Sequence, residues 1–170
     1  MSALLTGLAP LAQSGARVLI LGSMPGAESL ARQQYYAHPR NLFWPLMSEL
    51  TGLDASAAYA QKSQALTASG IALWDVIASC QRSGSLDSAI RNEQVNDFAG
   101  FFKSQPELVA IAFNGGKAFQ SFKRQVLATG CVPETVRLIA LPSTSPAHAA
   151  MKYEEKLQQW HQLSEFLAQK

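Results

Sequence analysis

Four mainly apolar runs divide the chain and predict the strands of one sheet. They are residues 17–22, 71–77, 108–113 and 136–141. Runs of this length in which apolar residues do not alternate with polar ones are typical of strands that are buried on both faces. Segments with apolar side chains at helical spacing separate the runs, so strands and helices alternate. This order predicts an α/β fold, a three-layer α/β/α sandwich with a mainly parallel four-stranded sheet, in a single domain over residues 1–170.

Apolar residues that recur every three or four positions predict the helices, and glycines mark several of their ends. Asn41 is a good N-cap for a helix that Gly52 ends. The predicted helices are residues 41–51, 54–69, 92–104, 117–128 and 151–169. We expect residues 1–16 to form a short helix or an irregular lead-in, and residues 23–39 and 80–92 to form loops.

Composition narrows the class of protein without identifying a partner. Of the 170 residues, 48% are hydrophobic and 15% are charged, as in a globular protein with a core. The formal net charge of +2 is compatible with a polyanionic partner but does not require one. The N-terminal stretch has neither a basic leader nor a long apolar run, so we expect a cytoplasmic protein with no membrane contact.

Cysteine usage argues against a bound metal or cluster. The chain has two cysteines, Cys80 and Cys131. Two thiols cannot supply the four ligands that an iron–sulfur cluster usually needs, and no CxxC or HxxxH pair suggests zinc. We therefore expect two buried thiols, no metal and no cofactor.

Loops follow the predicted strands, and parallel strands would bring these loops to one edge of the sheet, where α/β proteins bind ligands. They contain Gly22-Ser-Met-Pro-Gly26 with a polar-aromatic stretch that continues to Trp44, then Asp75, Asn114-Gly-Gly116 and Ser143–His148. The first loop matches neither the dinucleotide fingerprint nor the P-loop, so the sequence does not favour a nucleotide-binding fold of either kind.

Three of these segments together resemble the uracil-DNA glycosylase superfamily. GSMPG followed by YYAHPRNLFW is similar to its first motif, and LPSTSPAHA to its second. GIALWDV lies where relatives carry the strand that reads the base. The residues of these motifs are most similar to those of the hypoxanthine-DNA glycosylase group. The resemblance covers about residues 17–165.

The resemblance implies a base-excision repair enzyme that hydrolyses the N-glycosidic bond of a flipped, deaminated base in double-stranded DNA. Hypoxanthine is the expected base, with uracil and xanthine left open. No lysine falls within either motif, which argues for a monofunctional glycosylase rather than a lyase. We expect it to act as a monomer.

Two positions depart from the superfamily pattern. Met24 stands where many relatives have a catalytic Asp, Asn or Glu, and Leu141 stands where several have a His. Neither side chain can orient or activate water. The hypoxanthine group is similar in this respect and uses the Asn that corresponds to Asn41, to which we assign water positioning.

The resemblance, together with the chemistry of each side chain, suggests the remaining roles. Phe43 matches the ring on which the flipped base stacks. Asp75 would accept the ring N–H of hypoxanthine or assist catalysis, because a carboxylate inside an apolar run needs a partner or a shifted pKa. His148 would contact phosphate or protonate the leaving purine. The predicted catalytic residues are Asn41, Asp75 and His148; the base pocket comprises Gly22, Ser23, Met24, Pro25, Tyr36, His38, Phe43 and Asn114; the DNA contacts are Ser143, Thr144, Ser145 and Pro146.

Each assignment has a plain structural alternative. Phe43 could be a core residue, Asn41 a helix cap, Asp75 a cap or part of an ion pair, and residues 143–145 an ordinary Ser/Thr turn. We also expect the DNA-facing edge to carry basic side chains, namely Arg32, Arg40, Arg82, Arg91 and Lys117. Two other functions stay open: a damaged-DNA-binding protein that has lost catalysis, and a hydrolase acting on free nucleosides.

Overall fold

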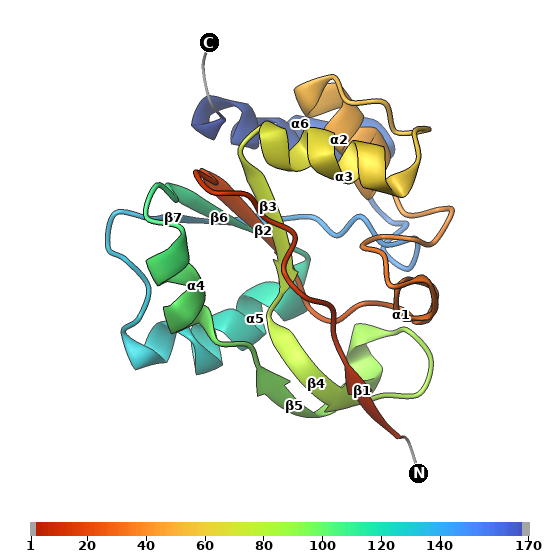
Figure 1. Cartoon of the computed structure of the whole chain (residues 1–170). Coiled ribbons are helices and arrows are strands. Elements are labelled where there is room, and N and C mark those ends of the chain that lie inside the picture. Colours follow the sequence, from red (N-terminus) through yellow and green to blue (C-terminus); the bar gives the residue numbers. More distant parts are fainter. Residues whose placement is uncertain (1–2, 168–170) are drawn as a thin grey trace.

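A computed structural model describes residues 3–167 and contains two sheets with helices around the larger one (Figure 1). The strands are β1 (Leu4–Thr6), β2 (Val18–Gly22), β3 (Ile71–Asp75), β4 (Ile77–Gln81), β5 (Arg91–Val95), β6 (Ala110–Asn114) and β7 (Arg137–Leu141). The α-helices are α1 (Ala27–Arg32), α2 (Phe43–Thr51), α3 (Tyr59–Ala68), α4 (Phe98–Ser104), α5 (Gly116–Gln125) and α6 (Tyr153–Trp160). Short 3₁₀ helices are η1 (Asp87–Ala89), η2 (Leu127–Thr129) and η3 (His161–Phe166).

The central sheet confirms the predicted fold class. It has four strands in the order β3-β2-β6-β7, and all three pairings are parallel. Every residue of β2, β3 and β6 is buried, as their mainly apolar sequences predict, and this includes the polar residues Asp75 and Asn114 at the ends of β3 and β6. The pairing places Gly22 beside Asp75 and Asn114 beside Leu141, so the ends of the strands bring distant parts of the chain together.

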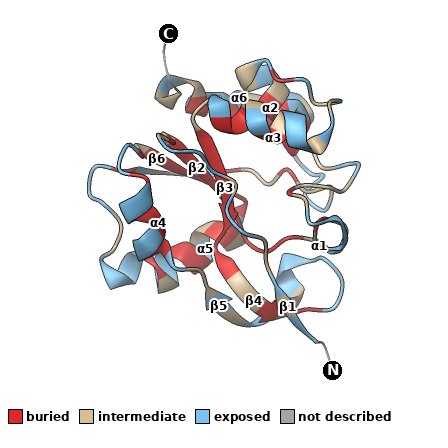
Figure 2. Cartoon of the chain, in the orientation of Figure 1, coloured by how far each residue is buried: buried red, intermediate tan, exposed pale blue. Residues whose placement is uncertain are grey.

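Helices cover both faces of this sheet and complete the three layers (Figures 1 and 2). On one face, α2, α3 and α6 pack against Val18 and Ile20 through residues such as Phe43 and Trp160. On the other face, α4 and α5 pack against the alternate residues of the same strands. Because successive side chains of a strand point to opposite faces, one apolar run supplies both cores.

The second sheet corrects three of the sequence predictions. Strands β1, β4 and β5 form an antiparallel sheet, although residues 1–16 were expected to be a short helix or an irregular lead-in, residues 80–92 a loop and residues 92–104 a helix throughout. The helix begins only at Phe98, because residues 91–95 pair with β4. Strand β5 is polar and half exposed, and its pairing with β4 is irregular in register. A pattern of this kind carries no apolar periodicity from which a strand could be predicted.

Several element boundaries also differ from those predicted. The second helix begins at Tyr59 rather than residue 54, since Asp54 accepts hydrogen bonds from Ser56 in a turn. The last α-helix ends at Trp160 and continues as 3₁₀ helix to Phe166, while residues 168–169 of that prediction lie outside the described residues. The loop expected over residues 23–39 contains helix α1. No helix in residues 3–167 is long and apolar enough to cross a membrane.

Replacing Phe122 tests the core between α5 and the sheet. Phe122 is fully buried and contacts Phe98 and Phe113 edge to face or tilted. We expect Phe122→Ala to lower the free energy of unfolding by about 3–5 kcal/mol, because it opens a cavity among aromatic rings. Urea denaturation measures this change, and Leu127→Ala at an exposed position should change stability by less than about 0.5 kcal/mol. Equal effects of the two variants would contradict the packing described here.

Candidate active site

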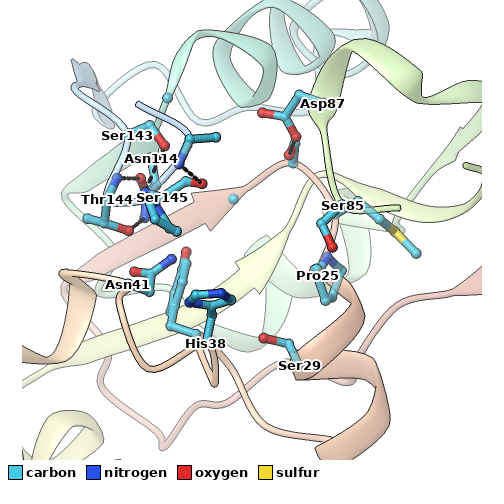
Figure 3. Close-up of a pocket in the computed structure, with 18 of the residues that line it drawn as sticks. Pro25, Ser29, His38, Asn41, Ser85, Asp87, Asn114, Ser143, Thr144 and Ser145 are labelled. Carbon is cyan, nitrogen blue, oxygen red and sulfur yellow. Dashed lines mark hydrogen bonds between the residues drawn. The ribbon is translucent and has the colours of Figure 1, made fainter. Parts of the chain in front are cut away.

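A pocket of about 690 Å³ lies at the carboxyl edge of the parallel sheet (Figure 3). The loops that follow β2, β6 and β7 contribute to its lining, together with Asp75 at the end of β3, because parallel strands end at the same edge of the sheet. It brings together every residue of the predicted site except Phe43. Those residues are Gly22, Ser23, Met24, Pro25, Tyr36, His38, Asn41, Asp75, Asn114, Ser143, Thr144, Ser145, Pro146 and His148. Their functional roles stay predictions.

Gly22 is the point at which two buried polar side chains converge. A Cβ atom on Gly22 would lie 2.6 Å from Oδ1 of Asp75 and 3.2 Å from the hydroxyl of Tyr36. Only glycine leaves room for both groups here. Among the described residues, Oδ2 of Asp75 has no hydrogen-bond partner, and the Tyr36 hydroxyl has none at normal geometry. Buried polar atoms without partners are costly, so the pair is suited to receiving a polar ligand.

The pKa of Asp75 is raised from 3.8 to about 7, mainly by burial and secondly by the negative charge of Asp87, while the positive charge of Arg82 opposes the rise. Burial, and secondarily the charge of Asp75, also raises the pKa of Tyr36, although the nearby Asn114 amide offsets part of this rise. Near neutral pH, Asp75 therefore exists in both protonation states, and it can either accept or donate a proton.

Phe43 does not line the pocket, contrary to its expected place in the base-binding set. It is fully buried in the core beneath Tyr36, and the two rings stack with centroids 4.1 Å apart and an interplanar angle of 21°. Tyr36, which has a positive φ of 54°, lines the pocket, as do the rings of Tyr35 and His38. Phe43 stacks against Tyr36 in the core, so Tyr36 rather than Phe43 is a ring at the pocket.

Asn41 lines the pocket on the chain that leads into α2. Its Oδ1 accepts a hydrogen bond of 2.9 Å from the backbone N–H of Phe43, and its own N–H donates to the carbonyl of His38. The N-cap position is Leu42, one residue after the predicted Asn41, but Asn41 still satisfies a free N–H of the first turn. The Nδ2 group keeps two donors for a bound molecule or water.

The loop after β7 is tied to the rest of the site by Thr144. Its N–H donates to Oδ1 of Asn114, and its hydroxyl accepts from Nδ2 of the same amide, at 2.9 and 3.0 Å. Its carbonyl accepts from the N–H of Leu42. Thr144 is only 1% exposed, so it is a structural link, and its expected contact with DNA phosphate has no support here. Ser143 and Ser145 stay accessible beside it (Figure 3).

Helix α6 holds the same loop from outside the pocket. Lys156 is 1% exposed, and its ammonium donates to the carbonyl of His148 at 2.6 Å. Trp160 donates from Nε1 to the carbonyl of Pro142 at 2.9 Å. Burial lowers the pKa of Lys156. The backbone of His148 is thus fixed, while its side chain is exposed at the mouth of the pocket.

Residues 85–88 also line the pocket, although they were not predicted from the sequence. Ser23 donates from its hydroxyl to Oδ1 of Asp87 at 2.6 Å, and Ser85 accepts from the N–H of Ala27 at 2.9 Å. This segment joins β4 to β5, so the small antiparallel sheet positions it. Strand β5 has no apolar pattern, so neither this strand nor the pocket segment before it could be predicted from the sequence.

The expected positive edge is only partly present. Arg40 lines the pocket and is exposed. Arg32 pairs with Glu28, and Lys117 pairs with Glu93. Arg82 is 5% exposed and donates to backbone carbonyls, so it supports the fold rather than a ligand surface.

The two departures from the superfamily pattern have structural explanations. Met24 packs in a small apolar cluster with Ile77, Cys80 and Ile90 under the antiparallel sheet. Leu141 is buried in the main core at the end of β7. Within residues 3–167, no group of three or more His, Cys, Asp or Glu side chains is arranged to hold a metal ion.

A four-stranded parallel sheet with a pocket of this composition at its carboxyl edge defines an α/β protein suited to binding a small polar group. The profile of the uracil DNA glycosylase superfamily matches residues 9–165. The chain therefore belongs to this superfamily.

Individual relatives narrow the comparison. A protein from Methanosarcina acetivorans named hypoxanthine DNA glycosylase is 42% identical over 132 residues, which cover 77% of this chain and 80% of that protein. A protein of the same name from Methanosarcina barkeri is 38% identical over 113 residues, covering 66% and 72%. The solution NMR structure of a candidate uracil DNA glycosylase from M. acetivorans superposes with a TM-score of 0.81 at 33% identity, over 95% of this chain and 97% of that one.

Gly115 and Gly116 both line the pocket but differ in backbone conformation and in the space around them, so they form a matched pair of variants. Gly115 has φ +98° and ψ 163°, and a Cβ there would lie 3.2 Å from Cβ of Ser143. Gly116 has open space around its Cα. We expect Gly115→Ala to lower the free energy of unfolding by about 1–3 kcal/mol, because only glycine adopts this backbone conformation readily. In thermal denaturation, Gly116→Ala should be neutral or stabilising by up to about 1 kcal/mol; the reverse order would contradict the structure.

The raised pKa of Asp75 predicts how stability depends on pH. The unfolded chain loses this proton near pH 3.8 and the folded chain near pH 7, so between these values the folded state binds more protons. Stability should therefore fall as pH rises through this window, by up to about 1.4 kcal/mol per pH unit from this group.

Asp75→Asn should remove that contribution, so its unfolding free energy relative to wild type should increase from pH 4 to pH 7. Urea titrations at several pH values measure the difference. Asp54→Asn is the control, because Asp54 is exposed and its hydrogen bonds with Ser56 lower its pKa. A constant difference between wild type and Asp75→Asn across the window would contradict the raised pKa.

Proposed function

We propose that this protein is a monofunctional DNA glycosylase that releases hypoxanthine from deoxyinosine in double-stranded DNA. The observation that carries the proposal is the convergence of Asp75 and Tyr36 on Gly22 at the pocket, where Oδ2 of Asp75 and the Tyr36 hydroxyl are buried without partners among the described residues. A purine has polar atoms around its edge and an aromatic face, and this site offers partners for both. The two relatives named hypoxanthine DNA glycosylase support the same substrate.

Hypoxanthine carries an N1–H donor next to the O6 acceptor. In the ionised form, Asp75 can accept the N1–H; in the protonated form, it can donate to a ring nitrogen or to O6. Tyr36 offers a hydroxyl for hydrogen bonding and a ring face for stacking. A base inside a duplex cannot reach this pocket, so the nucleotide must first leave the stack.

Hydrolysis breaks the bond between C1′ of the sugar and N9 of the purine. The electron pair leaves with the base, and the sugar passes through an oxocarbenium-like state before water adds to C1′. We assign to Asn41 the orientation of that water through its Nδ2 group, since its Oδ1 atom already accepts from the N–H of Phe43. An amide does not take up a proton at neutral pH, so Asn41 positions the water. Asp75 or His148 gives a proton to the departing base, and the proton that the water loses as it bonds to C1′ returns to that group.

The loop of residues 142–148 is proposed to position the DNA backbone. Ser143 and Ser145 are half-buried at the pocket, and their hydroxyls accept from N–H groups of the same loop, which leaves each O–H able to donate. Lys156 and Trp160 hold the loop from outside the pocket. Phosphate contacts of this kind set the register of the duplex without reading its sequence. Pro146 and His148 complete the mouth of the pocket.

The experiment is base release from matched duplexes that carry one deoxyinosine or one deoxyuridine. We expect wild type to release hypoxanthine and Asn41→Ala to be about 100-fold slower under single-turnover conditions, as when one preorganised polar group is removed. Asn41→Ser keeps an oxygen that can accept from the N–H of Phe43, so it separates loss of the cap from loss of water positioning. Asn92→Ala, on exposed strand β5, is the control.

The outcomes distinguish the candidate functions. Release of uracil alone would keep the glycosylase class and overturn the substrate. Tight binding of the inosine duplex without release of either base would favour a damaged-DNA-binding protein. Met24 is the reason to consider this function, because it is apolar where many relatives have a catalytic residue. Hydrolysis of free inosine but not of DNA would favour a nucleoside hydrolase.

A further inference from the structure

Lys156 is a buried cation that the proposed reaction does not use. It lies on α6 outside the pocket lining and is only 1% exposed. Its ammonium donates to the carbonyl of His148 at 2.6 Å, and no carboxylate of residues 3–167 forms an ion pair with it. Burying a charge without a counterion is unfavourable, so an apolar side chain would suit the fold here equally well or better. The lysine therefore indicates a role beyond the stability of the fold.

The loop over residues 142–148 has its carbonyl groups bound from outside the pocket. Three donors that do not line the pocket each bind one of these carbonyls. The pairs are Trp160 Nε1 with Pro142, the N–H of Leu42 with Thr144, and Lys156 Nζ with His148. Of these donors, Lys156 is the one that carries a charge. A carbonyl oxygen has partial negative charge, so holding it away from the pocket lowers the repulsion that an anion would meet at the loop.

The pocket side of the same loop presents hydrogen-bond donors. Ser143 and Ser145 line the pocket, and each hydroxyl accepts from an N–H of the loop, which leaves its O–H to donate. The loop itself contains no acidic residue. The acidic residues that line the pocket are Glu28, Asp75 and Asp87, from other segments. Figure 3 shows Asp87 across the pocket from Ser143 and Ser145, so an anion is favoured at the loop.

We propose that Lys156 is a positioning residue for DNA. Its ammonium holds the carbonyl of His148 outside the pocket, so that the hydroxyls of Ser143 and Ser145 are free to bind one phosphodiester of the inosine-containing strand. Its buried positive charge attracts the same phosphate through the loop, and the phosphate supplies the counterion that Lys156 lacks among the described residues. Lys156 acts through the loop and does not touch the reacting atoms. This inference rests on the proposed glycosylase function and specifies one of its DNA contacts.

The first test is binding of a duplex with one deoxyinosine, measured by fluorescence anisotropy in an Asn41→Ala background that slows base release. We expect Lys156→Met to raise Kd at least about tenfold, because a charge-assisted hydrogen bond and the charge itself are lost. Lys103→Met is the control, since it removes an exposed lysine at the end of α4, outside the pocket lining. It should change Kd less than about twofold, because solvent screens exposed charges.

Two further readouts separate positioning from a merely structural role. Lys156→Met should unfold at the wild-type temperature or above it, because an apolar side chain replaces a buried charge. With native Asn41, it should raise the enzyme concentration for half-maximal single-turnover release at least about tenfold and change the maximal rate less than about threefold. A lysine that served only the fold would lower the melting temperature instead. Failure of Lys156→Met to fold, or a loss confined to the maximal rate, would overturn the inference.

The phosphate is located by replacing the phosphodiesters on either side of deoxyinosine, one at a time, with neutral methylphosphonates. With native Lys156, one position should weaken binding at least about tenfold, because the charge that the loop binds is lost. At that position Lys156→Met should weaken binding less than about twofold further, since both changes remove the same interaction. At the other positions the two effects should multiply. Multiplying effects at every position, or unchanged affinity of Lys156→Met for the unmodified duplex, would contradict the inference.

Failure of this inference and failure of the glycosylase function give different results. Binding does not need catalysis, so the phosphate scan tests Lys156 even if the protein with native Asn41 releases no base. In that case the proposed function fails, and the scan alone decides whether Lys156 positions a phosphate. If hypoxanthine is released and the scan shows no coupling to Lys156, only the role of Lys156 is wrong.

Discussion

The site depends on a close approach at the end of strand β2. Parallel pairing places Gly22 directly beside Asp75, and the missing Cβ of Gly22 leaves space for the carboxylate and for the hydroxyl of Tyr36. Any other residue at position 22 would push both groups away. Because the Asp75 carboxylate is buried and is not held in an ion pair, its pKa rises to about 7. The strand register therefore produces a group that titrates near neutral pH.

Elements far from the pocket keep its walls in place. Buried Lys156 and Trp160 hold the loop after β7 from the helical layer, and buried Arg82 holds the segment around residues 85–88 from the antiparallel sheet. Each of these side chains donates to a backbone carbonyl, which fixes the path of a loop without occupying the pocket. The pocket is thus largely formed before any ligand binds, as sites that must orient reacting groups generally are.

The sequence predicts the layers and the edge where the site lies, because buried parallel strands have mainly apolar runs. The same reasoning places Asn41, Asp75 and Asn114 at one edge. It does not predict strand β5, whose residues are polar and whose pairing is irregular, and so it misses the part of the pocket lined by residues 85–88. Phe43 was misplaced for a different reason: the sequence does not tell which of two neighbouring aromatic rings covers the other, and Tyr36 covers Phe43.

Mass spectrometry of free hypoxanthine released from a duplex with one deoxyinosine, by wild type and by Asp75→Ala, tests most directly whether the buried carboxyl at Gly22 serves the removal of a flipped base. We expect wild type to release one hypoxanthine per inosine and leave an abasic site. Asp75→Ala should be at least about tenfold slower, because it loses a hydrogen bond to a charged group in a buried site. Release by Asp75→Ala at the wild-type rate, or no hypoxanthine from wild type, would contradict this role of Asp75.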